Sequence, residues 1–565
     1  MRKLLVFAVS LILLILGIRA SAQWSNDPSV NTPICTTYAN QLNPQIVFVG
    51  DGWIIAWEDD RYDAWRDIFA QKLSLDGHIL WDPAGVPICV APKIQRLGGL
   101  TSDGEGGAII VWSDARDNPF EPYPYPIDIY AQRIDSTGNV RWQVNGMPIC
   151  TAEEQQNGPV VCSDGEGGAI IAWMDERGFL LDVYAQRISH DGEILWDSNG
   201  VVVQPDSICT PGPKIVSDTK GGAILRFCSW VQRIDGNGNS LWGSEGILPL
   251  SLSAGIYDID KDGLGGIVLA LVRWLASSNE YYIYVQRIDS SGNRLWGDEG
   301  VLVSKYAGRQ TVPRIVSDGA GGAIVSWVAQ DPGEFGQLYV QRIDSNGTAV
   351  WTTNGVSVED SCTQLIFGMV TDNCGGADIY YTVDGKKYLY AQRINENGEF
   401  LWGDEGVMLS SRDFEPVPSL EINWGATDGD GGLLVVWYEL GDCFDIYGQW
   451  IDKYGNLGGV GVEERQGAGC KKQDARLLEI YPNPFHKSVV INYLLSRQDF
   501  VSLKVYDVSG SEVKTLVSRE QGAGEYKLRW DGKNYQGKEV KNGVYLLRLV
   551  VGPYKRTSKM VFIGN

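Results

Sequence analysis

Short apolar runs that alternate with glycine-rich turns recur along most of the chain. In residues 317–351, the turn at 318–322 leads into the apolar run 323–327, and residues 338–344 then reach a second turn before a segment that ends on tryptophan. Glycine supplies the positive φ angles of tight turns, whereas β-branched and aromatic residues favour half-buried strands. The pattern therefore predicts four short β-strands per repeat, and it contains no long amphipathic helix.

The third strand of this repeat has the most regular signature, an apolar and aromatic run that usually ends in Gln-Arg-Ile. It occurs eight times, at residues 67–73, 128–134, 182–188, 229–234, 282–288, 338–343, 388–394 and 445–451. A tryptophan followed by glycine four residues later marks the fourth strand and occurs only seven times, at Trp81, Trp142, Trp196, Trp242, Trp296, Trp351 and Trp402. The last repeat therefore lacks a fourth strand of its own.

The amino-terminal segment is a candidate for the missing strand. Pro33, Ile34 and Cys35 precede the first repeat, and the same tripeptide occurs at residues 87–89 and 148–150, just past the tryptophans of repeats one and two. An open ring of repeats would expose two strand edges, and exposed edges invite pairing with other chains. We therefore predict that the amino-terminal strand completes the last repeat and closes the ring.

Eight four-stranded repeats joined by a strand shared between both ends predict an all-β domain, an eight-bladed β-propeller over residues 23–460. A linear β-solenoid is the alternative architecture, and seven blades are the alternative count. We name the strands of a blade a to d, from the inside outward. The a–b and c–d turns are short and alike, whereas the b–c and d–a connections vary. Because alternate connections lie on opposite faces, the variable ones should share one face, where a partner would bind.

Both ends of the chain carry segments outside the repeats. Residues 1–22 are typical of a secretory signal peptide, with basic residues at 2–3, an apolar run at 4–18 and small residues at 20–22, and no later segment is apolar enough to span a membrane. A polar linker at 461–476 precedes a change in composition. Residues 477–565 contain short alternating runs that predict a small antiparallel β-sandwich.

Two resemblances follow from these motifs. Residues 1–460 resemble a bacterial secreted β-propeller. Residues 477–565 resemble the C-terminal sorting domain of type IX secretion cargo and the related immunoglobulin-like domain of the flagellar hook-capping family. The residues that carry the second resemblance are Tyr481, Pro482, Asn483, Pro484, Phe485, Gly543 and Tyr545, together with 505–510, 530–532 and 559–563.

The second resemblance implies an Ig-like domain that directs export through the type IX secretion machinery, which would place the protein outside the cell or on its outer surface. Residues 530–545 are closer to the hook-capping version than to the shorter sorting version. A purely structural terminal sandwich is therefore the alternative. The resemblances leave open whether the terminal domain is cleaved, and neither of them names a ligand.

The charge of the chain narrows the classes of partner that it could bind. The chain has 70 Asp and Glu against 48 Lys and Arg, yet residues 477–565 have 14 Lys and Arg against 8 Asp and Glu, so the repeats are more acidic than the whole. Nucleic-acid binding needs a basic surface and is therefore excluded.

Three cysteines, Cys35, Cys89 and Cys150, occupy the same site in different blades. This places them too far apart for disulfides, so we predict buried thiols.

Few residues suggest catalysis or metal binding. The chain has three histidines and none of the common nucleophile, zinc or phosphate-loop motifs, so we predict a protein that is not an enzyme. A glycosidase-like carboxylate pair would not stand out among so many acids. Asp258, Asp260 and Asp262 begin like a calcium loop, but the twelfth position is Leu269. We favour a structural turn over this weak calcium site, and no other cofactor is predicted.

Two features of the b–c loops are candidate ligand contacts. The run Trp-x-Asp-x-Arg occurs in three blades and ends at Arg61, Arg116 and Arg177. These arginines are candidate binding residues, although recurrence favours an ion pair that steadies each loop. The loop of repeat two is the longest and carries Phe120, Tyr123 and Tyr125 among prolines. Stiffened aromatics lose little entropy on binding, and packing over a neighbouring blade is the equal alternative.

Together these observations predict a secreted or cell-surface protein that binds an extracellular protein or glycan through the variable face without catalysing a reaction. Two other classes remain: a secreted carbohydrate-active enzyme with its site in the propeller channel, and a structural surface-layer protein.

Overall fold

The computed structural model describes residues 24–563 except for 63–64, 118–126, 179–180, 205–211, 252–253, 276–279, 306–307, 332–335, 363–366, 373–374, 384–387, 412–423, 460–474, 482–484, 496–497, 508–510, 523 and 552–553. The predicted signal peptide lies outside the described residues. The chain divides into two compact units, Met1–Gln466 and Gly467–Asn565. Every regular element among the described residues is a β-strand.

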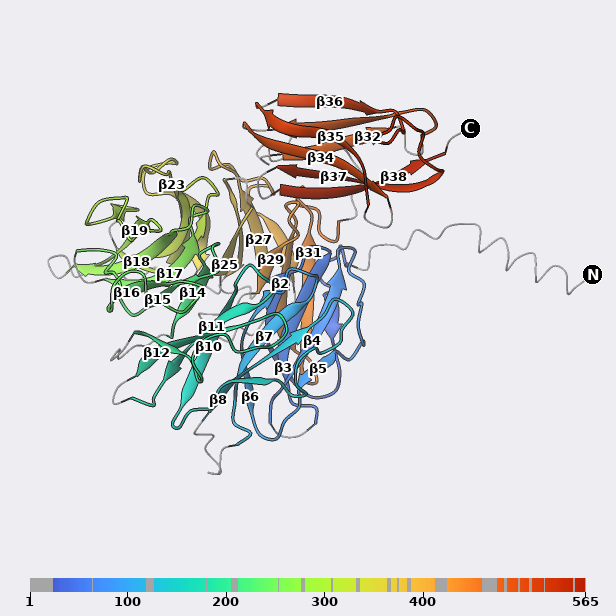
Figure 1. The fold of residues 1–565 in the computed structure, drawn as a ribbon. Helices are drawn as coiled ribbons and strands as arrows, with labels where there is room; N and C mark the ends of the chain where they lie inside the picture. Colours follow the sequence, from blue (N-terminus) through green and yellow to red (C-terminus); the bar gives the residue numbers. More distant parts are fainter. Residues whose placement is uncertain are drawn as a thin grey trace, which may run out of the picture. The chain divides into compact units, whose positions relative to one another are not determined.

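The described part of the first unit forms eight antiparallel sheets, here called blades one to eight (Figure 1). Blade one is β2 (Gln41–Phe48), β3 (Gly52–Asp59), β4 (Asp67–Ser74) and β5 (Val86–Cys89); blade two is β6 (Gln95–Ser102), β7 (Ala108–Asp114), β8 (Asp128–Ile134) and β9 (Met147–Cys150). Blade three is β10 (Gln156–Ser163), β11 (Ala169–Asp175), β12 (Asp182–Ile188) and β13 (Val201–Gln204); blade four is β14 (Lys214–Ser217), β15 (Ala223–Phe227) and β16 (Trp230–Ile234). Blade five is β17 (Gly255–Lys261), β18 (Ile267–Leu275), β19 (Glu280–Ile288) and β20 (Val301–Leu302); blade six is β21 (Arg309–Ser317), β22 (Ala323–Gln330), β23 (Gly336–Ile343) and β24 (Val356–Cys362). Blade seven is β25 (Phe367–Thr371), β26 (Ala377–Val383), β27 (Tyr388–Ile394) and β28 (Val407–Ser410); blade eight is β29 (Gly425–Thr427), β30 (Leu433–Leu440), β31 (Phe444–Ile451) and the amino-terminal β1 (Thr32–Cys35).

The core lies between the blades. Strand β3 is buried at every position, as expected for a b strand covered on both faces by neighbouring sheets. The largest buried cluster joins Trp53 and Trp57 of blade one to Leu433 and Trp437 of blade eight. The first and last repeats are therefore neighbours, and β2 lies beside β31 in Figure 1. This contact confirms the closed β-propeller and excludes the linear solenoid.

The ring closes through the amino-terminal strand, as predicted. β1 pairs antiparallel with β31, with Thr32 opposite Gly448 and Pro33 opposite Tyr447, and the register shifts before Cys35 meets Ile446. Blade eight thus takes its d strand from the amino terminus, and its edge is covered.

Eight tryptophans tie each blade to the next, and the sequence pattern identified seven of them. Each donates its indole N–H to a carbonyl in the next blade's c–d turn at 3.0 to 3.4 Å. The eighth is Trp24, which bonds Leu75 O of blade one. A β-carbon at Gly77 would lie 2.9 Å from the Trp24 ring, so this turn requires glycine. Trp24 therefore completes the ring of contacts.

Blade four departs from the four-stranded pattern. Its sheet has three strands, and the outer segment is reduced to an isolated bridge between Val231 and Ile247. In an antiparallel pair every second residue of a strand forms hydrogen bonds to its partner strand. After Ile247, the next residue of the outer segment that would donate its N–H is therefore residue 249. That residue is Pro249, which has no N–H to donate, and the strand cannot extend.

The second unit is the predicted β-sandwich. One sheet contains β32 (Ala475–Tyr481), β33 (Val489–Leu495) and β36 (Gly524–Trp530), and the other contains β35 (Glu512–Gln521), β34 (Asp499–Asp507), β37 (Gly543–Val551) and β38 (Tyr554–Phe562). The inward-facing residues of both sheets form one buried cluster around Phe485, Tyr493 and Trp530. Strand β32 begins at Ala475, inside the segment that the sequence assigned to the linker.

Candidate functional site on the variable face

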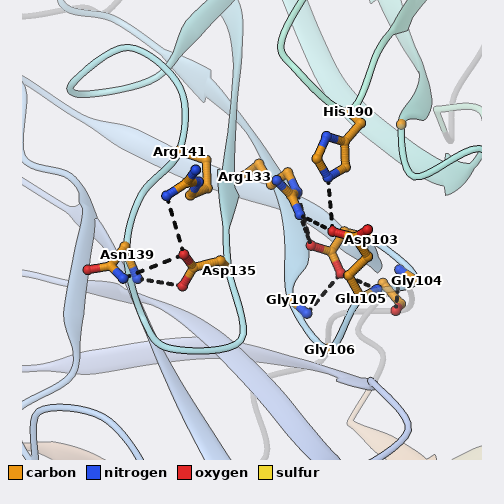
Figure 2. A network of polar contacts seen from close by, with 12 residues as sticks. Asp103, Gly104, Glu105, Gly106, Gly107, Arg133, Asp135, Asn139, Arg141 and His190 are labelled. Carbon is orange, nitrogen blue, oxygen red and sulfur yellow. Dashed lines mark hydrogen bonds and ion pairs between the residues drawn. The ribbon is translucent and has the colours of Figure 1, made fainter. Parts of the chain in front are cut away.

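The a–b and c–d turns form one face of the propeller, which we call the turn face. In blade two, Asp103 Oδ1 accepts the backbone N–H groups of Glu105 and Gly107 at 2.9 and 2.8 Å. Its other oxygen pairs with Arg133 of strand β8 at 2.8 Å (Figure 2). The same aspartate–arginine pair recurs at Asp164–Arg187, Asp218–Arg233, Asp262–Arg287 and Asp318–Arg342. Three of these arginines, Arg187, Arg233 and Arg342, also donate to a carbonyl group of the next blade. Because these charges are used in contacts within the propeller, the turn face is mainly a structural surface.

His190 adds a contact between two blades on the turn face. His190, in the c–d turn of blade three, bonds Glu105 of blade two at 3.1 Å (Figure 2). It also bonds its neighbour Asp191 at 3.0 Å. Two hydrogen bonds raise the pKa of His190: the one to Asp191 has the larger effect and the one to Glu105 the smaller. The histidine side chain is one-third exposed, so water screens this pair.

The opposite face, built from the b–c and d–a connections, is the variable face. In blades one to three it carries a recurring group that we call the clasp: a tryptophan and an aspartate at the end of strand b and the arginine two residues later. In blade one, Trp57 Nε1 donates to Asp59 Oδ2 at 2.9 Å, and Arg61 Nε donates to Asp59 Oδ1 at 2.8 Å. Arg61 also lies 4.1 Å above the Phe69 ring and donates to Ala84 O at 2.7 Å. The ion-pair interpretation of the repeated motif is thereby confirmed.

Each clasp also reaches the preceding blade. Arg116 and Arg177 repeat the contacts of Arg61, and all three arginines lie next to a cysteine on the outer strand of the blade before. The arginine-to-sulfur distances are 3.6 Å for Cys35, 3.2 Å for Cys89 and 3.0 Å for Cys150. All three thiols are buried and free, as predicted. Burial and the charge of Asp114 raise the pKa of Cys89 to about 12, so this thiol is protonated.

The three arginines predicted as candidate ligand contacts therefore point into the protein. Their side chains are 8, 15 and 22% exposed at Arg61, Arg116 and Arg177, and each guanidinium contacts a buried carboxylate. Their interior contacts give them a role in positioning the loops. The aromatic loop with Phe120, Tyr123 and Tyr125 lies outside the described residues.

The candidate calcium carboxylates are engaged within the protein. Asp258 pairs with Lys214 at 2.5 Å and accepts the Ile315 N–H at 3.1 Å. Asp260 accepts the Ser317 N–H at 2.8 Å, and Asp262 holds the a–b turn as Asp103 does. Among the described residues, no three His, Cys, Asp or Glu side chains are grouped so as to hold a metal ion. Asp262 makes the hydrogen bonds of a turn residue, to the N–H groups of Leu264 and Gly266.

The variable face carries exposed aromatic side chains that the sequence pattern did not predict. Tyr38 and Tyr62 are 78 and 65% exposed, and Trp65 is 36% exposed, all near the junction of blades eight and one. Trp274 and Tyr281, 53 and 37% exposed, lie opposite each other near the end of the β18–β19 hairpin. Each of these aromatic residues is present in one copy of a loop and absent from the equivalent loops. That difference between copies could have identified them in the sequence, whereas a comparison of shared residues does not.

The described residues of the proposed sorting motif hold the sandwich together. Phe485 is fully buried, with its ring 5.5 Å from that of Trp530 and 5.1 Å from that of Phe562. Tyr545 donates from its hydroxyl to Lys541 O at 2.8 Å. Tyr481 ends strand β32 and Gly543 begins β37, whereas Pro482, Asn483 and Pro484 lie outside the described residues.

Comparison with protein families finds one match, the FlgD Ig-like domain over residues 486–551. This match supports the Ig-like assignment of the second unit. No curated protein matches the chain. No helix among the described residues is long and apolar enough to cross a membrane.

Several solved structures share low similarity with the chain. PorZ, a surface component of the type IX secretion system of Porphyromonas gingivalis, is 10% identical over 92% of each chain, with a TM-score of 0.22. Polysaccharide lyase Uly1 is 10% identical over 65% of this chain and 90% of its own, with a TM-score of 0.36. The β-propeller domain of the trilobed protease from Pyrococcus furiosus is 9% identical over 64 and 98%, with a TM-score of 0.36. With TM-scores this low, none of them carries an argument about function.

Proposed function

We propose that this protein binds an extracellular protein or glycan through the variable face of the propeller and catalyses no reaction there. The contrast between the two faces is the observation that carries the proposal. On the turn face the charged side chains are used in repeated pairs, whereas the loops of the variable face differ between blades and present exposed aromatic rings. Loops on a rigid scaffold are where binding residues concentrate, and exposed aromatic rings are common binding contacts.

The test compares matched surface changes on the two faces of the mature chain. One variant replaces Tyr38, Tyr62, Trp274 and Tyr281 by alanine, and the control replaces Leu264 and Tyr454, which are 67 and 50% exposed in turns of the other face. Binding is measured on arrays of glycans and of secreted proteins. We expect the first variant to lose the signals of the wild-type protein and the control to keep them. Loss in the control alone, or no binding by the wild-type protein, contradicts the proposal.

We further propose that the terminal Ig-like unit serves export through the type IX secretion machinery and leaves the propeller at the outer cell surface. The resemblance of residues 477–565 to sorting domains supports this role, and the family match supports the fold it requires. The test fractionates the native host that produces either the full chain or a chain without residues 477–565. Surface delivery of the truncated chain at the wild-type level contradicts the sorting role.

A further inference from the structure

Three chain segments meet at the variable-face end of the seam, where the ring closes. Asn40, just before β2, accepts the backbone N–H of Asp60 at 3.1 Å with its own carbonyl, and its N–H donates to the Asp60 carboxylate at 2.6 Å. Its side-chain oxygen accepts the N–H of Phe444, the first residue of β31 in blade eight, at 3.2 Å. Asn40 therefore fixes the amino-terminal segment, the blade-one loop and the start of β31 against one another.

Two exposed tyrosines stand on this fixed junction. Tyr38 donates from its hydroxyl to the carbonyl of Arg61 at 2.9 Å, which places it beside Tyr62. Tyr62 packs on Phe69 with ring centroids 5.9 Å apart, and Phe69 in turn stacks on Trp57. Because Arg61 belongs to the clasp, both tyrosines are held by contacts below them while their rings face solvent. Little side-chain freedom would be lost if a ligand covered them.

Equivalent positions in blades two and three serve as internal references. The backbone contact from Asp60 to Asn40 recurs as Ala115 to Ile94 and as Glu176 to Gln155. By this alignment Tyr38 corresponds to Pro92 and Glu153, and Tyr62 corresponds to Asp117 and Gly178. The clasp is common to all three blades, and only the seam copy carries the tyrosine pair. The clasp needs no tyrosine at these positions, so the pair is an addition to the scaffold.

The surroundings of the pair indicate which ligand chemistry fits. Asp60, Asp442 and Asp445 lie in or next to the same three segments, and the nearby cation Arg66 pairs with the buried Glu58 at 2.5 Å. An acidic ligand would meet this excess of carboxylates and would be repelled. Two rings bordered by charged residues also make a smaller apolar area than protein interfaces usually bury at their centre. A sugar ring, which offers C–H groups to an aromatic face and hydroxyls to carboxylates, fits both features.

We propose that Tyr38 and Tyr62 form a carbohydrate-binding platform at the seam that stacks on the pyranose rings of a neutral polysaccharide. This inference rests on the proposed binding function of the variable face and assigns a site and a ligand class to it. The amino-terminal segment thus both closes the ring and contributes one of the two stacking residues.

The test is affinity electrophoresis of the mature chain in native gels that contain one soluble polysaccharide each. The neutral probes are dextran, a mixed-linkage β-glucan, galactomannan and arabinan, and the acidic probes are polygalacturonate and alginate. We expect retardation by at least one neutral probe and none by the acidic probes. Tyr38→Ala/Tyr62→Ala should weaken that binding at least tenfold, and Tyr62→Phe should preserve it, since the ring is what stacks.

The control Pro92→Ala/Asp117→Ala changes the equivalent exposed positions of blade two and should bind as the wild-type protein does. Because both tyrosines are exposed, the double variant should melt within a few degrees of the wild-type protein, which circular dichroism checks. Retardation by acidic probes only, by no probe, or equally in the double variant overturns the seam site. If the double variant still binds while the four-residue variable-face variant does not, the seam site fails and the proposed function stands.

Discussion

Blades one to three differ from blades six and eight at the end of strand b, where each has a buried tryptophan. In the first group a buried tryptophan N–H meets an aspartate, as Trp112 does with Asp114 at 2.7 Å. In blades six and eight the equivalent Trp327 and Trp437 are fully buried, and their N–H groups have no hydrogen-bond partner among the described residues. The aspartate is replaced by Ala329 in blade six and by Glu439 in blade eight, which turns instead to Asn31.

The difference shows which contacts the ring requires. The tryptophan-to-carbonyl contacts of the turn face occur at all eight junctions, whereas the clasp occurs in three blades. Closure therefore depends on the turn face and on the b strands, and the clasp adds local stability to the variable face where it occurs. The b–c loops of blades without a clasp vary in sequence. In blade one the clasp lies beneath two exposed residues, Tyr38 and Tyr62.

The largest expected effect comes from removing the element that closes the ring. Deleting residues 24–35 leaves the edge of β31 unpaired and removes the buried side chains of Trp24, Ile34 and Cys35. The loss should be on the order of 5 kcal/mol or more, because burying a tryptophan or isoleucine in a core is worth several kcal/mol each. Thermal unfolding by circular dichroism should show a much lower midpoint, and size-exclusion chromatography should show self-association through the open edge.

Trp24→Ala separates the tryptophan contact from the strand pairing. It should cost about 3–5 kcal/mol, as other buried tryptophans do, and leave the oligomeric state unchanged because β1 still covers the edge. A deletion variant that melts like the wild-type protein would show that closure is not needed for stability.

A smaller effect is expected from breaking one clasp. Asp114→Ala leaves the buried Trp112 N–H and the Arg116 guanidinium without their carboxylate, which should destabilise the protein by about 3–5 kcal/mol. Asp114→Ala/Arg116→Ala makes blade two resemble blade six, which lacks both groups. The double variant should lose less than the sum of the single ones, because no buried charge is left unpaired.

Chemical denaturation of the three variants measures this coupling. Ala329→Ser in blade six is the matched control at the equivalent position and should change stability little. Additive single effects would mean that the aspartate and arginine act independently, and the clasp would then not be a unit.

Most of the scaffold was predictable because it repeats. The turn aspartates, the Gln-Arg-Ile strands and the Pro-Ile-Cys tripeptides appear several times, so each copy supports the assignment of the others, and the closing strand was found by counting them. Trp24 was missed because it is followed by Pro28 rather than by glycine four residues later, and it lies eleven residues before Cys35 instead of eight. Because of this longer connection, the equivalence of Trp24 to the other seven tryptophans is recognised only from its hydrogen bond to Leu75 O.

The candidate site was less predictable for the opposite reason. Arg61, Arg116 and Arg177 stood out because they repeat, and in the structure all three pair with buried aspartates. Tyr38 and Tyr62 occur once each and come from segments that are 24 residues apart in sequence. Their adjacency depends on hydrogen bonds at Asn40 and Arg61, which no local pattern encodes. Unique residues on a repeated scaffold are therefore the ones that need the structure.

The smallest expected effect concerns the turn face and its pH dependence. His190 has a raised pKa in the folded protein because it bonds Asp191 and Glu105. A raised folded pKa means that the stabilising contribution is fully present below the unfolded value of 6.5 and is lost as the pH rises through the folded value. Since the pair is partly exposed and screened, the contribution should be below about 1 kcal/mol.

His190→Gln isolates this contribution from the rest of the ring. The difference in melting temperature between the wild-type protein and this variant should be larger at pH 5.5 than at pH 8.5, and 0.5 M salt should reduce it at the lower pH. A difference that is equal at the two pH values would show that protonated His190 does not stabilise the fold. It would then remove the contact between His190 and Glu105 from the set of contacts that hold the ring together on the turn face.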